Sequence, residues 1–201
     1  MVMATVIPTK GESTRERIIE SAYGMARREG LEGLTIGSLA AEVGMSKSGV
    51  FAHFGSLEDL QLALLDSGAR RFVEHVFTPA LKQPRGLKRL ASVVEAWFGW
   101  VHFNGGSCVL LGAVSEYDSR EGVLHDAVLR QQTEWRRALA KAATLAVETG
   151  ELGAATDVEQ LAFEIYSVVL GMNHDAGLFG YEAARQRAER AFARLVGSYG
   201  P

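Results

Sequence analysis

The sequence predicts an all-α protein in which a small N-terminal domain of three helices precedes a larger helical domain. Three observations favour this fold class. In one segment after another, apolar residues recur every three or four positions, as they do on one face of a helix. The 201 residues include only four prolines, so long helices are permitted, and glycines gather where the apolar patterns end. A chain of this length can hold a small domain joined to a larger one.

Two short helical patterns meet at a turn within residues 35–54, which read TIGSLAAEVGMSKSGVFAHF. Thr35 precedes the first apolar face as a candidate N-cap, and Gly44 follows it where a helix end favours positive φ. Ser46 can cap the second helix, and the β-branched Val50 can fill the angle between the two. A small residue, a glycine and a β-branched residue at these spacings are typical of a helix-turn-helix.

In a helix-turn-helix, the second helix enters the major groove of DNA with its N-terminal residues first. Here that helix begins with short hydrogen-bonding side chains, one cation and a glycine that lets the backbone approach closely. Taken singly, each of these residues can also be explained as a cap, a solvated charge or a packing glycine. Together with Thr35 and two arginines that can contact phosphates, they predict a DNA-binding surface of Arg15, Arg17, Thr35, Ser46, Lys47, Ser48, Gly49, Phe51 and His53.

Residues 14–60 resemble the N-terminal domain of the TetR family of bacterial transcriptional regulators. The resemblance rests on TRERIIESAYGMARREG and LTIGSLAAEVGMSKSGVFAHFGSLEDL, with an aromatic–x–His–Phe ending before a serine-capped helix. The chain departs from the family pattern at Phe51, where tyrosine is usual, and at Leu57, where lysine is frequent. The resemblance implies a transcriptional regulator, expected to be a repressor, that binds a palindromic operator as a dimer and is released by a small apolar effector.

The charge of the chain does not by itself indicate nucleic-acid binding. The net charge is −3, and residues 1–57 hold six lysines and arginines against six glutamates, so DNA affinity must come from where the charges lie. Cys108 is the only cysteine, which excludes an intramolecular disulfide. The N-terminus does not resemble a signal peptide and the apolar stretches are too short for a bilayer. We therefore expect a cytoplasmic protein without membrane contact.

The domain boundaries follow from the helical patterns. Residues 1–12 are expected to form a flexible tail, 13–56 the DNA-binding domain, and 57–201 the effector-binding and dimerisation domain. The first helix is expected to begin at Ser13 or Thr14, and a loop is expected around Pro79 and Pro84. A helix over residues 57–78 would connect the two domains. The further helices are expected over residues 87–103, 107–117, 123–148, 157–179 and 181–199.

Aromatic side chains in the larger domain are typical of a helical core. Given the TetR resemblance, they also indicate an apolar effector pocket between helices. The expected pocket residues are Trp97, Trp100, Phe103, Cys108, Leu111, Trp135 and Tyr166. No cofactor is expected, and no metal, because the spacing of the histidines in this domain matches no compact ligand motif.

The helix over residues 157–179 has two apolar faces and therefore needs two partners. One partner is the core of its own domain. The second face, which contains Phe163, Tyr166, Leu170 and Gly177, predicts a homodimer through residues 157–199.

Two other functions remain open at this point. The chain could be a DNA-binding regulator controlled by a protein partner or by oxidation of Cys108. A helical enzyme is the remaining class, but the sequence has no nucleophile elbow, phosphate loop, HExxH or paired-carboxylate motif.

Overall fold

The structure, a computed structural model, describes residues 10–106 and 108–201. Within these residues the chain consists of helices joined by turns and loops, with no strand, which confirms the all-α prediction. None of these helices is both long and apolar enough to cross a lipid bilayer. The elements in chain order are α1 (Lys10–Glu29), α2 (Ile36–Val43), α3 (Lys47–Phe54), α4 (Leu57–Phe72), the π-helix η1 (Val73–Phe77), α5 (Thr78–Ala80), α6 (Leu87–Phe103), α7 (Val109–Tyr117), α8 (Val123–Glu148), α9 (Val158–Phe179) and α10 (Tyr181–Ser198).

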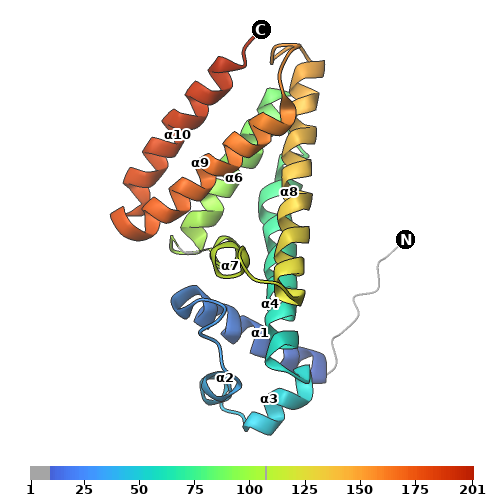
Figure 1. Cartoon of the computed structure of the whole chain (residues 1–201), viewed down its shortest axis with the longest axis vertical. Coiled ribbons are helices and arrows are strands. Elements are labelled where there is room, and N and C mark those ends of the chain that lie inside the picture. The colour runs from blue at the N-terminus through green and yellow to red at the C-terminus, as the bar shows by residue number, and fades with distance from the viewer. Residues whose placement is uncertain (1–9, 107) are drawn as a thin grey trace, which may run out of the picture.

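The molecule is elongated, with α1, α2 and α3 gathered at one end, α6, α8, α9 and α10 extending to the other, and α7 between them (Figure 1). Helix α4 extends from the small end toward the large one and packs against α1 and α3 as well as α7 and α8. The buried apolar side chains of both parts form one continuous core. The two parts are therefore joined by packing as well as by the chain.

Two expected helix starts are corrected by the structure. Helix α1 begins at Lys10, so residues 10–12 of the expected tail are helical, and residues 1–9 lie outside the described residues. Glu12 in the first turn suits the positive end of the helix dipole, which favours the earlier start. Helix α7 begins at Val109 with Cys108 at the N-cap, and Ser107 lies outside the described residues.

The helix that leaves the small end is longer and less regular than expected. After α4, the chain continues as the π-helix η1 and then as α5, so helical structure reaches Ala80 instead of ending at Thr78. The predicted loop at Pro79 is wrong, because Pro79 lies in the first turn of α5, where a proline needs no N–H donor. Pro84 does lie between α5 and α6, outside any helix.

Gly68 lies where α4 crosses both α1 and α7. A Cβ atom at this position would be 3.0 Å from Cε2 of Tyr23 on α1 and 3.1 Å from Cδ2 of Leu110 on α7. The hydroxyl of Tyr23 also approaches Oδ1 of the buried Asn104, at 3.4 Å, just after α6. The absence of a side chain at Gly68 thus lets the small end of the molecule pack closely against the large one.

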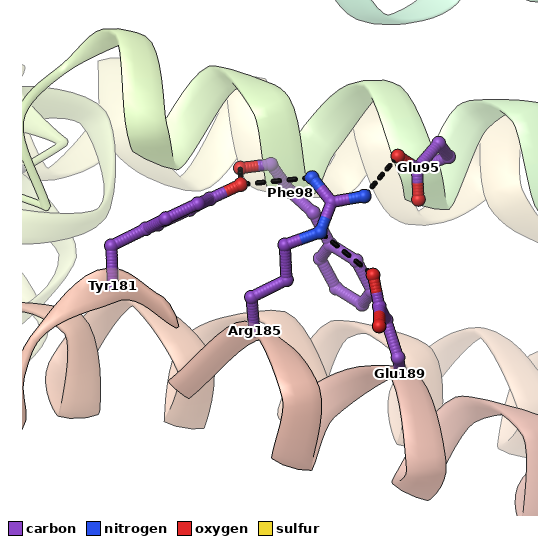
Figure 2. Close-up of polar contacts among 5 residues, drawn as sticks. All are labelled: Glu95, Phe98, Tyr181, Arg185 and Glu189. Atoms are coloured by element: carbon purple, nitrogen blue, oxygen red, sulfur yellow. Dashed lines mark hydrogen bonds and ion pairs between the residues drawn. The ribbon is translucent and has the colours of Figure 1, made fainter. Parts of the chain in front are cut away.

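Helix α10 is fixed to α6 through the guanidinium of Arg185, as Figure 2 shows. This group donates to Glu189 (2.7 Å) and to the Tyr181 hydroxyl (2.9 Å), and it forms an ion pair with Glu95 on α6. The hydrogen bond to Tyr181, followed by those to the two carboxylates, raises the pKa of Arg185. The Tyr181 hydroxyl in turn donates to the Phe98 carbonyl (3.3 Å).

The outer face of α9 differs from the predicted one at a single residue. Phe163, Leu170 and Gly177 are exposed, as the prediction of a second apolar face requires. Tyr166 is only 4% exposed, so its place on that face is wrong. It points inward because it lies four residues after the buried Ala162 and three before the buried Val169, on the same side of the helix, and its ring meets Trp97 of α6 at 6.1 Å between centroids.

Candidate DNA-binding surface and ligand cavity

The turn between α2 and α3 has the geometry that its sequence predicts. Thr35 caps α2 by accepting from the backbone N–H of Ser38 (3.0 Å), and Gly44 ends the helix in the left-handed region at φ 67°. Ser46 caps α3 by accepting from the backbone N–H of Gly49 (3.0 Å). Val50 is fully buried and holds the angle between the two helices. These contacts fix the orientation of α3 relative to the rest of the small domain.

The solvent-facing side of α3 consists of Lys47, Ser48, Phe51 and Ala52, which we call the α3 surface. Phe51 is 52% exposed, which is unfavourable for an aromatic ring in water unless a partner covers it. Of the other predicted contact residues on α3, Gly49 and His53 are half-buried. Sequence reasoning missed Ala52, whose methyl group is a suitable apolar contact for a thymine methyl.

Lys47 lies against the start of α2. Its Cε is 3.1 Å and its Nζ 3.4 Å from the position that a Cβ atom on Gly37 would take. The lysine ammonium thus lies beside a helix N-terminus, where unpaired backbone N–H groups and the helix dipole favour an anion. Thr35, the cap of that helix, is exposed next to it. This arrangement suits a phosphate.

The two predicted arginines lie in the first half of α1, and Arg15 is near the end of α3. The guanidinium of Arg15 is 4.8 Å from the ring centroid of Phe54, the last residue of α3. Arg15 and Arg17 are both exposed. The hydroxyl of Ser46 is already engaged as a cap and lies 3.1 Å from the Ser48 hydroxyl, so Ser46 contributes mainly to the position of α3.

Most of the predicted pocket residues belong to the core. Phe72, at the end of α4, is surrounded by three tryptophans, with centroid distances of 4.4 Å to Trp135, 5.0 Å to Trp97 and 5.8 Å to Trp100. We call these four residues the Phe72 cluster. Its rings pack against one another between α4, α6 and α8, so the three tryptophans belong to the core, and their place in an effector pocket stays a prediction.

Three further expected pocket residues also lie away from the cavity described below. Leu111 is buried in the core. Phe103 is 68% exposed and stacks on His75 and Trp100 at the surface, because α6 ends there. Cys108 is buried, and its Sγ accepts a hydrogen bond from Trp100 Nε1 (3.3 Å). Burial raises the pKa of the Cys108 thiol, which is the opposite of what a redox-sensing cysteine requires.

A cavity of about 320 Å³ lies between α7, α8 and α9, and we call it the α7–α9 cavity. Its volume is within the range of small-molecule sites. Of the expected pocket residues, only Tyr166 lines it. The complete lining is Val114, Tyr117, Asp118, His125, Val128, Leu129, Gln132, Thr133, Arg136 and Tyr166.

Arg136 and Gln132 are the polar residues of special interest in this wall. The guanidinium of Arg136 lies over the ring of Tyr166, 4.4 Å from its centroid, and 5.8 Å from that of Phe163. Gln132 is only 9% exposed, and its Oε1 has no hydrogen-bond partner. Burial raises the pKa of Tyr166, while Arg136 opposes the shift. Within residues 10–106 and 108–201, no group of three His, Cys, Asp or Glu residues is placed to hold a metal ion.

Comparison with known families assigns both parts of the chain. Residues 18–64 match the bacterial regulatory proteins of the tetR family, and residues 86–192, more than half of the chain, match the tetracyclin repressor-like C-terminal domain. The chain belongs to the TetR family. It is therefore a DNA-binding transcriptional regulator of a non-enzymatic family, which confirms the sequence resemblance.

Individual TetR-family relatives match over different lengths. The chain is 24% identical to the HTH-type transcriptional regulator SrpR of Pseudomonas putida over 190 residues, which cover 94% of this chain and 84% of SrpR. It is 35% identical to the HTH-type transcriptional repressor AcnR of Corynebacterium glutamicum over 74 residues, or 37% of this chain and 39% of AcnR. The crystal structure of AibR in complex with isovaleryl coenzyme A and operator DNA has the same fold, with a TM-score of 0.71, 20% identity and coverage of 93% of this chain and 98% of AibR.

One contact between the two TetR-family domains escaped sequence reasoning. Glu116 on α7 accepts hydrogen bonds from the backbone N–H groups of Leu31 (3.0 Å) and Glu32 (2.7 Å), in the loop between α1 and α2. Gln61 on α4 donates to the carbonyl of Leu31 (2.9 Å), and Arg120 forms an ion pair with Glu32. No local pattern marks Glu116, because its partners are backbone groups far away in the sequence.

Proposed function

We propose that the chain is a ligand-responsive repressor that binds a palindromic operator as a homodimer and is released by a small effector in the α7–α9 cavity. The observation that carries this proposal is the position of α7. Val114 and Tyr117 on this helix line the cavity, and Glu116 between them holds the loop that leads into α2. A ligand that moves α7 therefore acts directly on the DNA-binding domain.

The exposed residues of the helix-turn-helix support specific roles on DNA. Ser48, Phe51 and Ala52 on the α3 surface would contact base edges in the major groove. Lys47 and Thr35, beside the N-terminus of α2, would bind one phosphate. Arg15, Arg17 and His53 would contact the flanking backbone, and Gly49 would allow α3 to approach the DNA closely.

The homodimer would form through α9 and α10, within residues 157–199. The support is an apolar outer face on α9, where Phe163 and Leu170 are 50% and 36% exposed. Two copies would contribute four helices to a bundle and would place two α3 helices on one side of the DNA. Their separation must match one DNA turn, roughly 34–36 Å.

Repression and ligand binding have support from relatives. AcnR is a repressor by its name, and AibR has been crystallised in complex with isovaleryl coenzyme A and operator DNA. In our proposal, the effector prefers an arrangement of α4 and α7 in which the two α3 helices no longer fit successive major grooves. A preference of about 1–3 kcal/mol changes operator affinity about 5–150-fold.

A gel-shift experiment with the DNA upstream of the chain's own gene tests this proposal. We expect saturable binding that unlabelled upstream DNA competes away and random DNA does not. A metabolite panel, screened by thermal shift, should then contain compounds that release the complex. By reciprocity, operator DNA must weaken the binding of such a compound by the same factor. A regulator controlled by a protein partner would show the gel shift with no releasing compound, and an enzyme would show neither.

A further inference from the structure

Two buried polar atoms without partners belong to residues in the wall of the α7–α9 cavity. Within the described part of the chain, four such atoms are Trp97 Nε1, Gln131 Nε2, Gln132 Oε1 and Arg136 Nε. Gln132 and Arg136, one turn apart on α8, line the cavity. Trp97 and Gln131 are not among the residues that line it. Native proteins rarely leave such atoms unsatisfied, so the two in this wall indicate a missing hydrogen-bonding partner.

Of the two atoms in the wall, Gln132 Oε1 is an acceptor, and Arg136 Nε is a donor that belongs to a cation. No ion pair joins Arg136 to a carboxylate among the described residues, and its guanidinium instead lies against the rings of Tyr166 and Phe163. The carboxylate of Asp118 lies at an exposed part of the wall, and His125 at the same wall is paired with Asp126. A half-buried guanidinium without a counter-charge favours an anion, and its planar fork matches a carboxylate.

The rest of the wall limits the size and character of the ligand. A volume of about 320 Å³ corresponds to about ten water molecules at roughly 30 Å³ each. Val114, Val128 and Leu129 supply an apolar surface on which a hydrocarbon chain or ring can pack.

From these observations we infer that the effector is an organic acid of about ten non-hydrogen atoms, with its carboxylate on Arg136 and its apolar body against Val114, Val128 and Leu129. This inference rests on the proposed effector-responsive function and names the class of compound that the site accepts. The unpaired Oε1 of Gln132 is an acceptor, so it would accept from a hydroxyl or N–H donor elsewhere on the ligand and would not bind the carboxylate. A cationic ligand is disfavoured, because it would meet the positive charge of Arg136.

The test compares matched ligands that differ in charge alone. Octanoate and octanamide have the same size, as do 3-phenylpropanoate and its amide, and octylammonium gives the opposite charge. Binding to the purified full chain is measured by calorimetry and by tryptophan fluorescence at pH 7.5. We expect at least one acid to bind about tenfold more tightly than its amide, since a charged hydrogen bond is worth about that factor. Octylammonium should bind more weakly than octanoate and octanamide.

Variants of α8 test whether Arg136 causes the preference for the acid over its amide. Arg136→Gln should remove the preference for the acid over the amide, and Arg136→Lys, which keeps the charge without the fork, should retain part of it. Arg137→Gln is the matched control, because Arg137 is exposed on the same helix and lies outside the cavity wall. Arg137→Gln should bind the acids as the wild type does.

The inference is overturned if no acid binds, if acid and amide bind equally well, or if Arg136→Gln keeps the preference. Should Arg136→Gln fail to fold, as judged by circular dichroism, equal acid and amide binding by Arg136→Lys would likewise overturn it. The proposed repressor function and the inferred ligand class are contradicted by different results. A chain that binds the acids but gives no gel shift contradicts the repressor assignment alone, and a chain that binds its operator without any preference for acids contradicts the ligand class alone.

Discussion

The carboxylate of Glu116 accepts the backbone N–H of Leu31 at 3.0 Å, although 85 residues separate the two in the sequence. The second carboxylate oxygen accepts the N–H of Glu32 at 2.7 Å, so one side chain of α7 holds two successive amides of the α1–α2 loop. This loop ends at Thr35, the cap of α2. A displacement of α7 would therefore be transmitted to the first helix of the helix-turn-helix.

Replacing Glu116 by Gln should weaken this connection. The amide nitrogen of glutamine cannot accept, so one of the two hydrogen bonds is lost and the other loses its charge. We expect the free energy of unfolding to fall by about 1–2 kcal/mol and the release of operator DNA by a bound acid such as octanoate to become smaller. Urea unfolding and gel shifts with and without octanoate measure both effects. Glu121→Gln, at an exposed position beyond α7, is the control. Unchanged release in Glu116→Gln would exclude this route of coupling.

Replacing Lys47 by Ala should weaken operator binding and reduce its salt dependence. If the ammonium binds one phosphate beside α2, the slope of log affinity against log salt should fall in magnitude by about one. Lys88→Ala, on α6, serves as the control, because Lys88 is exposed far along the chain from the helix-turn-helix. The role given to Lys47 would be wrong if affinity and slope matched those of the wild type.

Replacing Leu170 by Glu should produce monomers that no longer bind the operator. The change places a charge on the apolar outer face of α9, where burial in a dimer would be costly. Sedimentation velocity at micromolar concentration measures the oligomeric state. Leu81→Glu is a matched control, since Leu81 is 65% exposed outside α9 and α10, and that variant should remain dimeric. A monomeric wild type would refute the dimer.

Two glycine substitutions should change stability in opposite directions. Gly68→Ala adds a methyl group about 3 Å from Tyr23 and Leu110, and such overpacking costs about 1–3 kcal/mol. Gly99→Ala, inside α6, meets no atom within 4 Å and should stabilise the protein by about 0.5–1 kcal/mol through helix propensity. Denaturant unfolding monitored at 222 nm measures both. A Gly68→Ala protein as stable as Gly99→Ala would show that the α4 crossing is loosely packed.

The thiol of Cys108 should be unreactive in the folded protein. Burial raises its pKa, so below its ordinary value near pH 9 the thiol stays protonated, and the side chain is also inaccessible. An aromatic disulfide reagent at pH 8 should react only as fast as the protein unfolds, and fast in urea. Rapid reaction of the native protein would revive the proposal of control by cysteine oxidation.

The sequence predicts the helix-turn-helix well because its determinants are local. The cap at Thr35, the left-handed glycine at Gly44 and the buried Val50 each act within a few residues, so the pattern and the geometry coincide. Long periodic helices such as α6 and α8 are predicted with the same bounds for the same reason.

The cavity could not be predicted in this way. Tryptophans are large enough to line a pocket or to fill a core, and the choice depends on how α4, α6 and α8 pack around Phe72. One signal was present in the sequence and was not used. Gln131 and Gln132 interrupt the apolar stripe of α8 between Val128 and Trp135, and two amides on an inward-facing stripe indicate a polar site.

Helix α4 packs against helices of both domains, α1 and α3 on one side and α7 and α8 on the other. This packing limits how the gene can exchange segments with related genes. Leu60, Leu64 and Leu65 of α4 are fully buried in the core that both ends of the molecule share, and Gly68 fits only against a matching Tyr23 and Leu110. A crossover that exchanged residues 13–56 for those of another regulator would place a foreign α1 against the existing α4. The two helix surfaces would not have evolved to pack together. Operator preference and ligand preference are therefore expected to be inherited as one unit and to diverge mainly by point substitution.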